Sequence, residues 1–197
     1  MKARIQAANQ LIALVLTSPE GLRASLRGLP VSRLVDVAAR FRPGPLICPE
    51  AAGKLAMRHL ARRHAALSAE IMSLDRDLGM LVAEAAPALL SLPGIGTDVA
   101  GALLVTAGDN PERLGSESAF ARLCGVAPLP ASSGKTSRHR LNRGGDRIAN
   151  NALWRIVLVR MSADDRTRGY VERRTKEGLS KREIIRCLKR YVAREVY

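Results

Sequence analysis

The chain has 197 residues, 47% of them hydrophobic and 25% charged, which is enough to bury a core and is typical of a globular protein. Its formal net charge is +14, and residues 135–197 hold most of it, with 18 basic and 7 acidic residues against 14 and 11 in residues 1–134. Such a field attracts nucleic acid or an anionic membrane. The three cysteines, Cys48, Cys124 and Cys187, lack metal-ligand spacing, and their odd number argues against a disulfide scaffold and for a reducing cytoplasm.

A membrane location is disfavoured by the apolar runs, which are too short. Leu11–Leu16 is far below the roughly 20 residues of a spanning helix and too short for a signal-peptide core. We therefore expect a soluble cytoplasmic protein, associated with the nucleoid when it binds DNA, and no membrane partner.

The first third of the chain is predicted to be helical. Residues 2–17 form an amphipathic helix with Ile5, Ile12 and Leu16 on its apolar face. Ser18 is expected to cap a second helix that begins at Pro19. Another short helix covers residues 31–41, and a proline-rich break follows it.

A long helix over residues 51–86 has the clearest periodicity of the chain. Its apolar positions alternate in three- and four-residue steps, which predicts a coiled-coil seam: Met57, Leu60, His64, Leu67, Ile71, Leu74, Leu78, Leu81 and Ala85. The seam either packs on helix 2–17 of the same chain or joins two copies into a homo-oligomer, and the sequence does not choose between them.

The segment Leu92-Pro93-Gly94-Ile95-Gly96 reads as a tight turn between two helices and resembles the helix–hairpin–helix motif of DNA-binding proteins. Gly94 and Gly96 would let the turn lie against a phosphate, and Thr97 would cap the next helix, whose N-terminus binds anions. The alternative is a compact turn that uses glycine for close packing.

The remaining predicted helices cover residues 116–123, 146–161, 166–177 and 180–196, with no strand-rich region. Trp154 is expected in the core. In the last helix, Ser180 and Glu183 have capping-box spacing. Its buried face is predicted to hold Ile184, Leu188, Tyr191 and Val192, whereas its basic residues, Lys189 among them, mostly lie elsewhere.

The most informative segment is residues 131–146, a loop with glycines, hydroxyl side chains and cations. Ser132, Ser133, Thr136 and Ser137 are candidate nucleophiles, and the residue types do not distinguish them. A hydroxyl that attacks a phosphodiester needs close backbone approach and fixed cations. We therefore predict phosphate contacts from five basic residues, Lys135, Arg138, Arg140, Arg143 and Arg147, and a nucleic-acid contact from Asn142. The alternatives are an exposed role in solubility for each cation and a capping or helix-surface role for Asn142.

The order of these parts resembles the C-terminal part of the insertion-sequence transposases of family one hundred and ten, the bridge-RNA-guided DNA recombinases. The resemblance rests on the hairpin, the approach Phe120–Pro128, the Ser132-Ser133-Gly134 loop and the segment Arg140–Asp146. It implies that Ser133 is the nucleophile that cuts and rejoins DNA strands, and that a guide RNA selects the DNA by base pairing.

Complete members of that family begin with a RuvC-like domain whose four acids bind magnesium, and no part of this sequence resembles it. We therefore expect a truncated form, inactive alone, with no cofactor in this chain and with magnesium supplied by the missing N-terminal domain. The expected architecture is mainly α. Residues 1–86 would form a helical linker and coiled coil, and residues 87–197 a transposase domain. The alternative is a non-catalytic helix–hairpin–helix module that binds nucleic acid.

Overall fold

A computed structural model describes residues 1–109, 111–131, 139–140, 142 and 144–197. The architecture is mainly α, as predicted, and the chain divides into two compact units, Met1–Arg76 and Asp77–Tyr197. No helix within the described ranges has both the length and the apolar character needed to cross a membrane.

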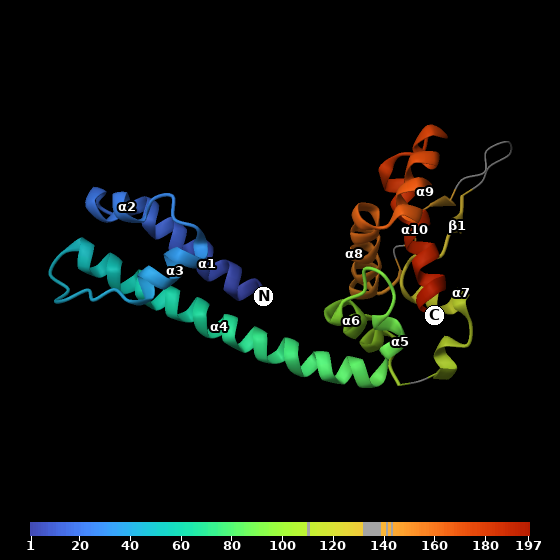
Figure 1. Cartoon of the computed structure of the whole chain (residues 1–197), viewed down its shortest axis with the longest axis horizontal. Helices are drawn as coiled ribbons and strands as arrows, with labels where there is room; N and C mark the ends of the chain where they lie inside the picture. Colours follow the sequence, from blue (N-terminus) through green and yellow to red (C-terminus); the bar gives the residue numbers. More distant parts are fainter. Residues whose placement is uncertain (110, 132–138, 141, 143) are drawn as a thin grey trace. The chain divides into compact units, whose positions relative to one another are not determined.

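The first unit is a helical cluster built from α1 (Lys2–Thr17), α2 (Glu20–Leu26), α3 (Val31–Ala39) and the first part of α4 (Pro49–Ala85), as Figure 1 shows. Its core joins Leu11 and Val15 of α1 to Leu22, Leu34 and Met57. Every one of these side chains is at most 5% exposed, so the unit has a dry centre of its own.

The apolar face predicted for α1 was wrong, although the helix itself is confirmed. Ile5 and Leu16 are 56% and 62% exposed, whereas Ala7, Ala8, Leu11 and Val15 are buried. The two alanines have small side chains, which let neighbouring backbones come close, and this face therefore packs best.

The predicted cap between α1 and α2 was also wrong. The Ser18 hydroxyl donates back to the carbonyl oxygen of Leu14 at 2.6 Å, which ends α1. Pro19 stands at the N-cap of α2 with no side-chain hydrogen bond, and its fixed φ sets the entry into that helix.

The apolar seam of α4 is covered at its N-terminal end within the first unit. Met57 and Ala61 are completely buried, and Leu60 packs against the same core. Further along the helix, Leu74 is 59% and Leu81 64% exposed. The chain therefore covers the start of the seam itself, and a coiled coil with a second copy stays a prediction.

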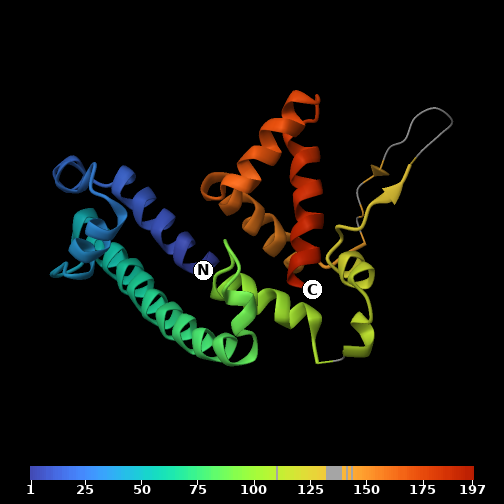
Figure 2. The same cartoon turned by 45° about the vertical axis from the view of Figure 1, so that its right-hand side comes forward.

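The second unit begins with the end of α4 and is organised around α8. Its elements, seen from two sides in Figures 1 and 2, are α5 (Pro87–Leu90), α6 (Thr97–Ala107), the 3-10 helix η1 (Pro111–Leu114), α7 (Glu117–Leu123), β1 (Leu129–Pro130), β2 (His139–Arg140), α8 (Arg147–Ala163), α9 (Asp165–Lys176) and α10 (Lys181–Val196). Helix α8 packs against α6, α9 and α10. Because these four helices hold one another, the residues at the two ends of α8 keep fixed positions relative to each other.

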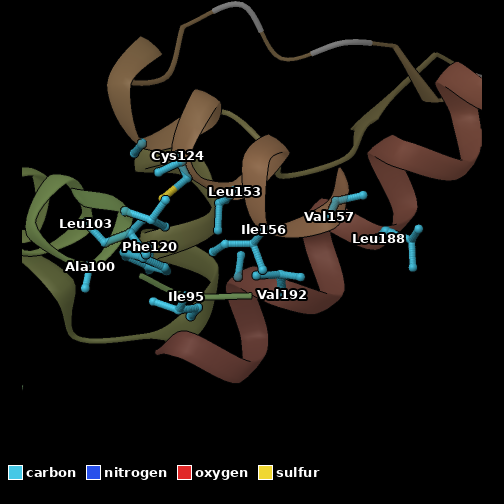
Figure 3. Close-up of a cluster of buried hydrophobic side chains, with 14 of the residues drawn as sticks. Ile95, Ala100, Leu103, Phe120, Cys124, Leu153, Ile156, Val157, Leu188 and Val192 are labelled. Carbon is cyan, nitrogen blue, oxygen red and sulfur yellow. The ribbon is translucent and has the colours of Figure 1, made fainter. Parts of the chain in front are cut away.

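The core of this unit surrounds the middle of α8. Leu153 and Ile156 are fully buried, and Figure 3 shows them among Leu103 of α6, Phe120 of α7 and Val192 of α10. Burying a side chain of this size contributes about 1.5–3 kcal/mol.

The helix starts around the core are capped by side chains. Ser116 accepts a hydrogen bond from the Ala119 amide, Asp146 accepts from the amides of Ile148 and Ala149, and Ser180 and Glu183 form the predicted capping box. Asp164 caps α9, and hydrogen bonds from the hydroxyl and the amide of Thr167 lower the pKa of its carboxyl.

Two aromatic side chains lie differently from the prediction. Trp154, expected in the core, is 40% exposed, and Tyr191 on α10 is 52% exposed. Trp154 follows the buried Leu153 by one position and precedes the buried Ile156 by two, so it projects from a flank of α8 rather than from its buried face.

Cys124 should be the least reactive thiol of the native protein. It is fully buried, and burial followed by the nearby Asp146 charge raises the pKa of its thiol to about 12, from an ordinary 9.0. Such a shift leaves about a thousandfold less thiolate at a given pH. Alkylation at pH 8, followed by mass spectrometry, should modify the exposed Cys48 and spare Cys124, and denaturant should make both react. Equal labelling of the two in native buffer would contradict this burial.

Candidate nucleic-acid interface

The predicted hairpin turn is built on a buried isoleucine and a left-handed glycine. The amide of Ile95 donates to the carbonyl oxygen of Leu92 at 3.2 Å, and its side chain enters the core. Gly94 has φ +76°, and a Cβ there would lie 3.4 Å from the Ile156 carbonyl oxygen. The glycine at this position therefore permits close packing of the turn on α8.

The other end of the turn is open. Apart from its chain neighbours, no described residue comes within 4 Å of where a Cβ of Gly96 would be, and Gly96 itself is exposed. Gly96, rather than the predicted Thr97, stands at the N-cap of α6, and Thr97 is the first helical residue. The cap prediction fails because no side-chain hydrogen bond forms at this end. DNA contact by Gly94, Gly96 and Thr97 stays a prediction.

Arg160 fixes this turn to two helices. Its Nε donates to the carbonyl oxygen of Pro93 at 2.7 Å, and its guanidinium forms an ion pair with Glu195 of α10. The side chain of Arg160 is 11% exposed, so this pair is better shielded than an ordinary surface ion pair. The orientation of the turn is thereby tied to the packing of α8 and α10.

At the opposite end of α8, two glycines bring two loops into direct contact. Gly125, with φ +65°, follows α7, and a Cβ on it would be 3.2 Å from the Cα of Gly145. Next to this contact the amide of Asp146 donates to the carbonyl oxygen of Leu123 at 2.6 Å. We call this contact the glycine junction (Gly125 and Gly145). It holds the end of α7 against the start of α8.

Asn150 reinforces the glycine junction from inside. Its amide nitrogen donates to the carbonyl oxygens of Cys124 and Gly125, at 2.8 and 3.3 Å. Its amide oxygen accepts a hydrogen bond from the ammonium of Lys189 on α10 at 2.8 Å. One side chain therefore connects α8, the loop after α7 and α10.

The loop that contains Ser132 and Ser133, which we call the serine loop, lies between two short strands that pair with each other. Strands β1 and β2 pair antiparallel, with Leu129 opposite Arg140 and Pro130 opposite His139 (Figure 2). The predicted nucleophile Ser133 and the predicted contacts Lys135, Arg138 and Arg143 lie outside the described residues. The structure therefore fixes the base of this loop, since paired strands run about 5 Å apart.

Beside the base of the loop lies a basic groove of about 920 Å³ between α10 and the segment after α7. Six cations line it: Arg140, Arg174, Arg186, Lys189, Arg190 and Arg194. Among the described residues that line it, Glu183 is the single acid. Arg174 pairs with Glu177, and Arg190 and Arg194 pair with Glu117, so part of this charge is balanced at the edges.

Of the six cations that line this groove, only Arg140 was predicted from the sequence as a nucleic-acid contact. Lys189 is the one among the other five whose burial was also predicted wrongly. It was expected away from the buried face of α10, yet it is 8% exposed. Burial and then repulsion from Arg186 lower the pKa of its ammonium. Its position next to Leu188 and three residues before Val192, both buried, places it on the buried face of the helix and was the available signal.

Of the contacts predicted from the sequence, the structure brings together Arg140, Asn142 and Arg147, because Asn142 lines one cavity with each of the other two. Asn142 and Arg140 line the basic groove, and Asn142 and Arg147 line a smaller cavity of about 370 Å³ with Trp154 and Asn151. The hairpin turn is separate from them. It contacts α8 at Arg160, and 13 residues at about 1.5 Å each place it roughly 20 Å along the helix from Arg147.

The fold is thus a helical domain with a basic groove beside a hydroxyl-rich loop. Residues 86–172 match the family described as "Transposase IS116/IS110/IS902 family". This match assigns the domain at residues 86–172 to the insertion-sequence transposases of that family.

Two relatives support the same assignment. Over 135 residues, 68% of its length, the chain is 34% identical to the "Insertion element IS110 uncharacterized 43.6 kDa protein" of Streptomyces coelicolor, of which it covers 31%. It is 29% identical over 136 residues, 64% of its length, to the "Insertion element IS900 uncharacterized 42 kDa protein" of Mycobacterium paratuberculosis, of which it covers 34%. The chain spans about a third of the length of these relatives.

The glycine junction should tolerate no side chain at Gly145. A methyl group there would overlap the backbone nitrogen and Cα of Gly125, so Gly145→Ala should lower the free energy of unfolding by about 1–3 kcal/mol or more. Gly144→Ala is the matched control, because its Cβ would meet nothing closer than Asn142 Oδ1 at 3.5 Å. Urea titration of both variants measures the difference, and equal stability of the two would contradict the close approach.

Proposed function

We propose that this chain acts in the cutting and rejoining of DNA at an insertion sequence, with Ser133 as the nucleophile and the basic groove as a DNA-binding surface. The observation that carries the proposal is the transposase domain at residues 86–172, which includes the base of the serine loop and part of the groove. The net charge of residues 135–197, +11, supports a polyanionic partner.

The proposed reaction is a transesterification. The Ser133 hydroxyl oxygen forms a bond to a DNA phosphorus, and the bond between that phosphorus and a deoxyribose oxygen breaks. The serine proton passes to a base, and the leaving oxygen takes up a proton to become a hydroxyl group. The phosphoserine ester keeps the energy of the broken bond, so a second strand end can reverse the step without ATP. The base is needed because a serine hydroxyl is a weak nucleophile until a base or a metal ion activates it.

The resemblance supplies two further parts of the proposal, a magnesium ion and a guide RNA. Within the described part of the chain, no three acidic, histidine or cysteine residues form a group that could hold a metal ion. The magnesium would therefore be held by residues of the RuvC-like domain that the resemblance implies. The guide RNA would choose the DNA by base pairing, which leaves this chain to bind backbones.

The serine mechanism is tested by trapping a covalent adduct. The chain is mixed with element-end DNA, guide RNA, magnesium and the RuvC-like domain of a relative, and the products are resolved on a denaturing gel. We expect an adduct with the wild-type chain and with Ser132→Ala, and none with Ser133→Ala. An adduct of equal yield with Ser133→Ala would remove this serine from the mechanism. DNA binding with no adduct from any of the proteins would favour the non-catalytic binding module.

We also propose that the exposed part of the α4 seam joins two copies of the chain. Leu74 and Leu81 lie on one stripe of the helix, seven residues apart, and both are exposed, so a second seam would bury them.

Leu74→Lys should shift the protein from an oligomer to a monomer in sedimentation velocity, because a charge would enter the shared seam. The folded chain should tolerate this change, since Leu74 is 59% exposed. Ala69→Lys is the control: it adds the same charge at an exposed position on the far side of the helix and should leave the assembly intact. A Leu74→Lys protein that sediments like the wild type would exclude this seam as the interface.

A further inference from the structure

Lys189 is a buried cation whose described hydrogen bond goes to a neutral group. It is 8% exposed, and its ammonium donates to the amide oxygen of Asn150 at 2.8 Å. No carboxylate in the described part of the chain forms an ion pair with it. After burial, the charge of the Arg186 guanidinium, which has the same sign, further lowers the pKa of the Lys189 ammonium.

This arrangement is costly for the free protein. An ammonium carries three N–H donors, and Asn150 accepts from one of them. Burying a charge without a counter-charge is unfavourable, and the lowered pKa of the Lys189 ammonium reports that cost. An apolar side chain of similar length would avoid it. An anion bound to the other two N–H donors of the Lys189 ammonium would offset the free-energy cost of burying its charge.

The basic groove gives such an anion access to Lys189. Lys189 lines it together with Arg186 of the same helix and Arg140 of β2. Gly125, Val126 and Ala127 of the loop after α7 also line the groove, and Gly125 brings no side chain into it. Asn150, which donates hydrogen bonds to the carbonyl oxygens of Cys124 and Gly125, accepts one from the Lys189 ammonium and holds it in place.

We propose that Lys189 binds a backbone phosphate of DNA in the basic groove, with Arg186 and Arg140 as the flanking phosphate contacts. This inference rests on the proposed function and specifies where its DNA backbone is held. A phosphodiester supplies a single negative charge and two acceptor oxygens, which matches the free donors of Lys189. The groove is far larger than one phosphate group, and its cations come from several elements, so it fits a chain of phosphates better than a small free anion.

The test compares the DNA affinity and the thermal stability of charge-removing variants. Lys189→Met removes the charge at similar length, and Lys189→Gln also keeps a donor for Asn150. Lys181→Met is the matched control, because Lys181 lies on the same helix, is exposed and does not line the groove. Binding of a fluorescent DNA duplex is measured by anisotropy over a range of salt concentrations, with an RNA duplex and inorganic phosphate as competitors.

We expect both Lys189 variants to bind DNA about tenfold more weakly and to reduce the slope of log affinity against log salt by about one. Their melting temperatures should be equal to or higher than that of the wild type, because a buried charge has been removed. Lys181→Met should leave the slope unchanged.

Three results would overturn the proposal while leaving the proposed function intact. The first is that the Lys189 variants keep the wild-type affinity and slope. The second is that they lose affinity only in proportion to their loss of folded protein. The third is a Lys189-dependent affinity seen with RNA or with inorganic phosphate but not with DNA. Failure of the wild-type chain to bind DNA at any salt concentration would instead contradict the proposed function itself.

Discussion

The contact between Gly125 and Gly145 is the constraint on which the candidate site depends. It allows the loop after α7 to touch the turn before α8, and the Leu123 carbonyl and the Asn150 amide then fix both segments with hydrogen bonds. The strands at the base of the serine loop connect these same two segments, so their placement follows from the contact. Gly125 and the residues after it line the basic groove together with His139 and Arg140 of β2, so the groove lies beside the base of the loop.

Along α8, the side chains that form the core of the second unit and the polar side chains lie at different positions. The middle of the helix supplies Leu153 and Ile156 to the core, and its C-terminal end holds the hairpin turn through Arg160. Its N-terminal end carries Arg147, Asn150 and Asn151, which line the smaller cavity of about 370 Å³. A rigid apolar centre with charged groups at one end is a suitable arrangement for holding a polyanion without disturbing the core.

The sequence predicted the helices well because their signals are local. Capping residues such as Ser180 with Glu183, and the breaks at proline and glycine, depend on neighbours within a few positions. The errors concern two helix caps, at Ser18 and Thr97, and the choice of which face of a helix is buried. Ile5 and Trp154 are exposed because distant elements decide which face of each helix finds a partner, and no local pattern records those partners. The burial of Lys189 did have a local signal, its position beside Leu188 and three residues before Val192, which the prediction did not use. The glycine junction also escaped prediction, since its two residues are 20 positions apart and their glycines look like ordinary turn formers.

The central claim is that the basic groove of the second unit receives the DNA backbone. Hydrogen–deuterium exchange of the whole chain, free and saturated with DNA, tests it most directly. Protection should concentrate in residues 125–128, 139–147 and 183–194, with α2 and α3 unchanged. Protection confined to the first unit, with those three segments exchanging as in the free protein, would contradict it.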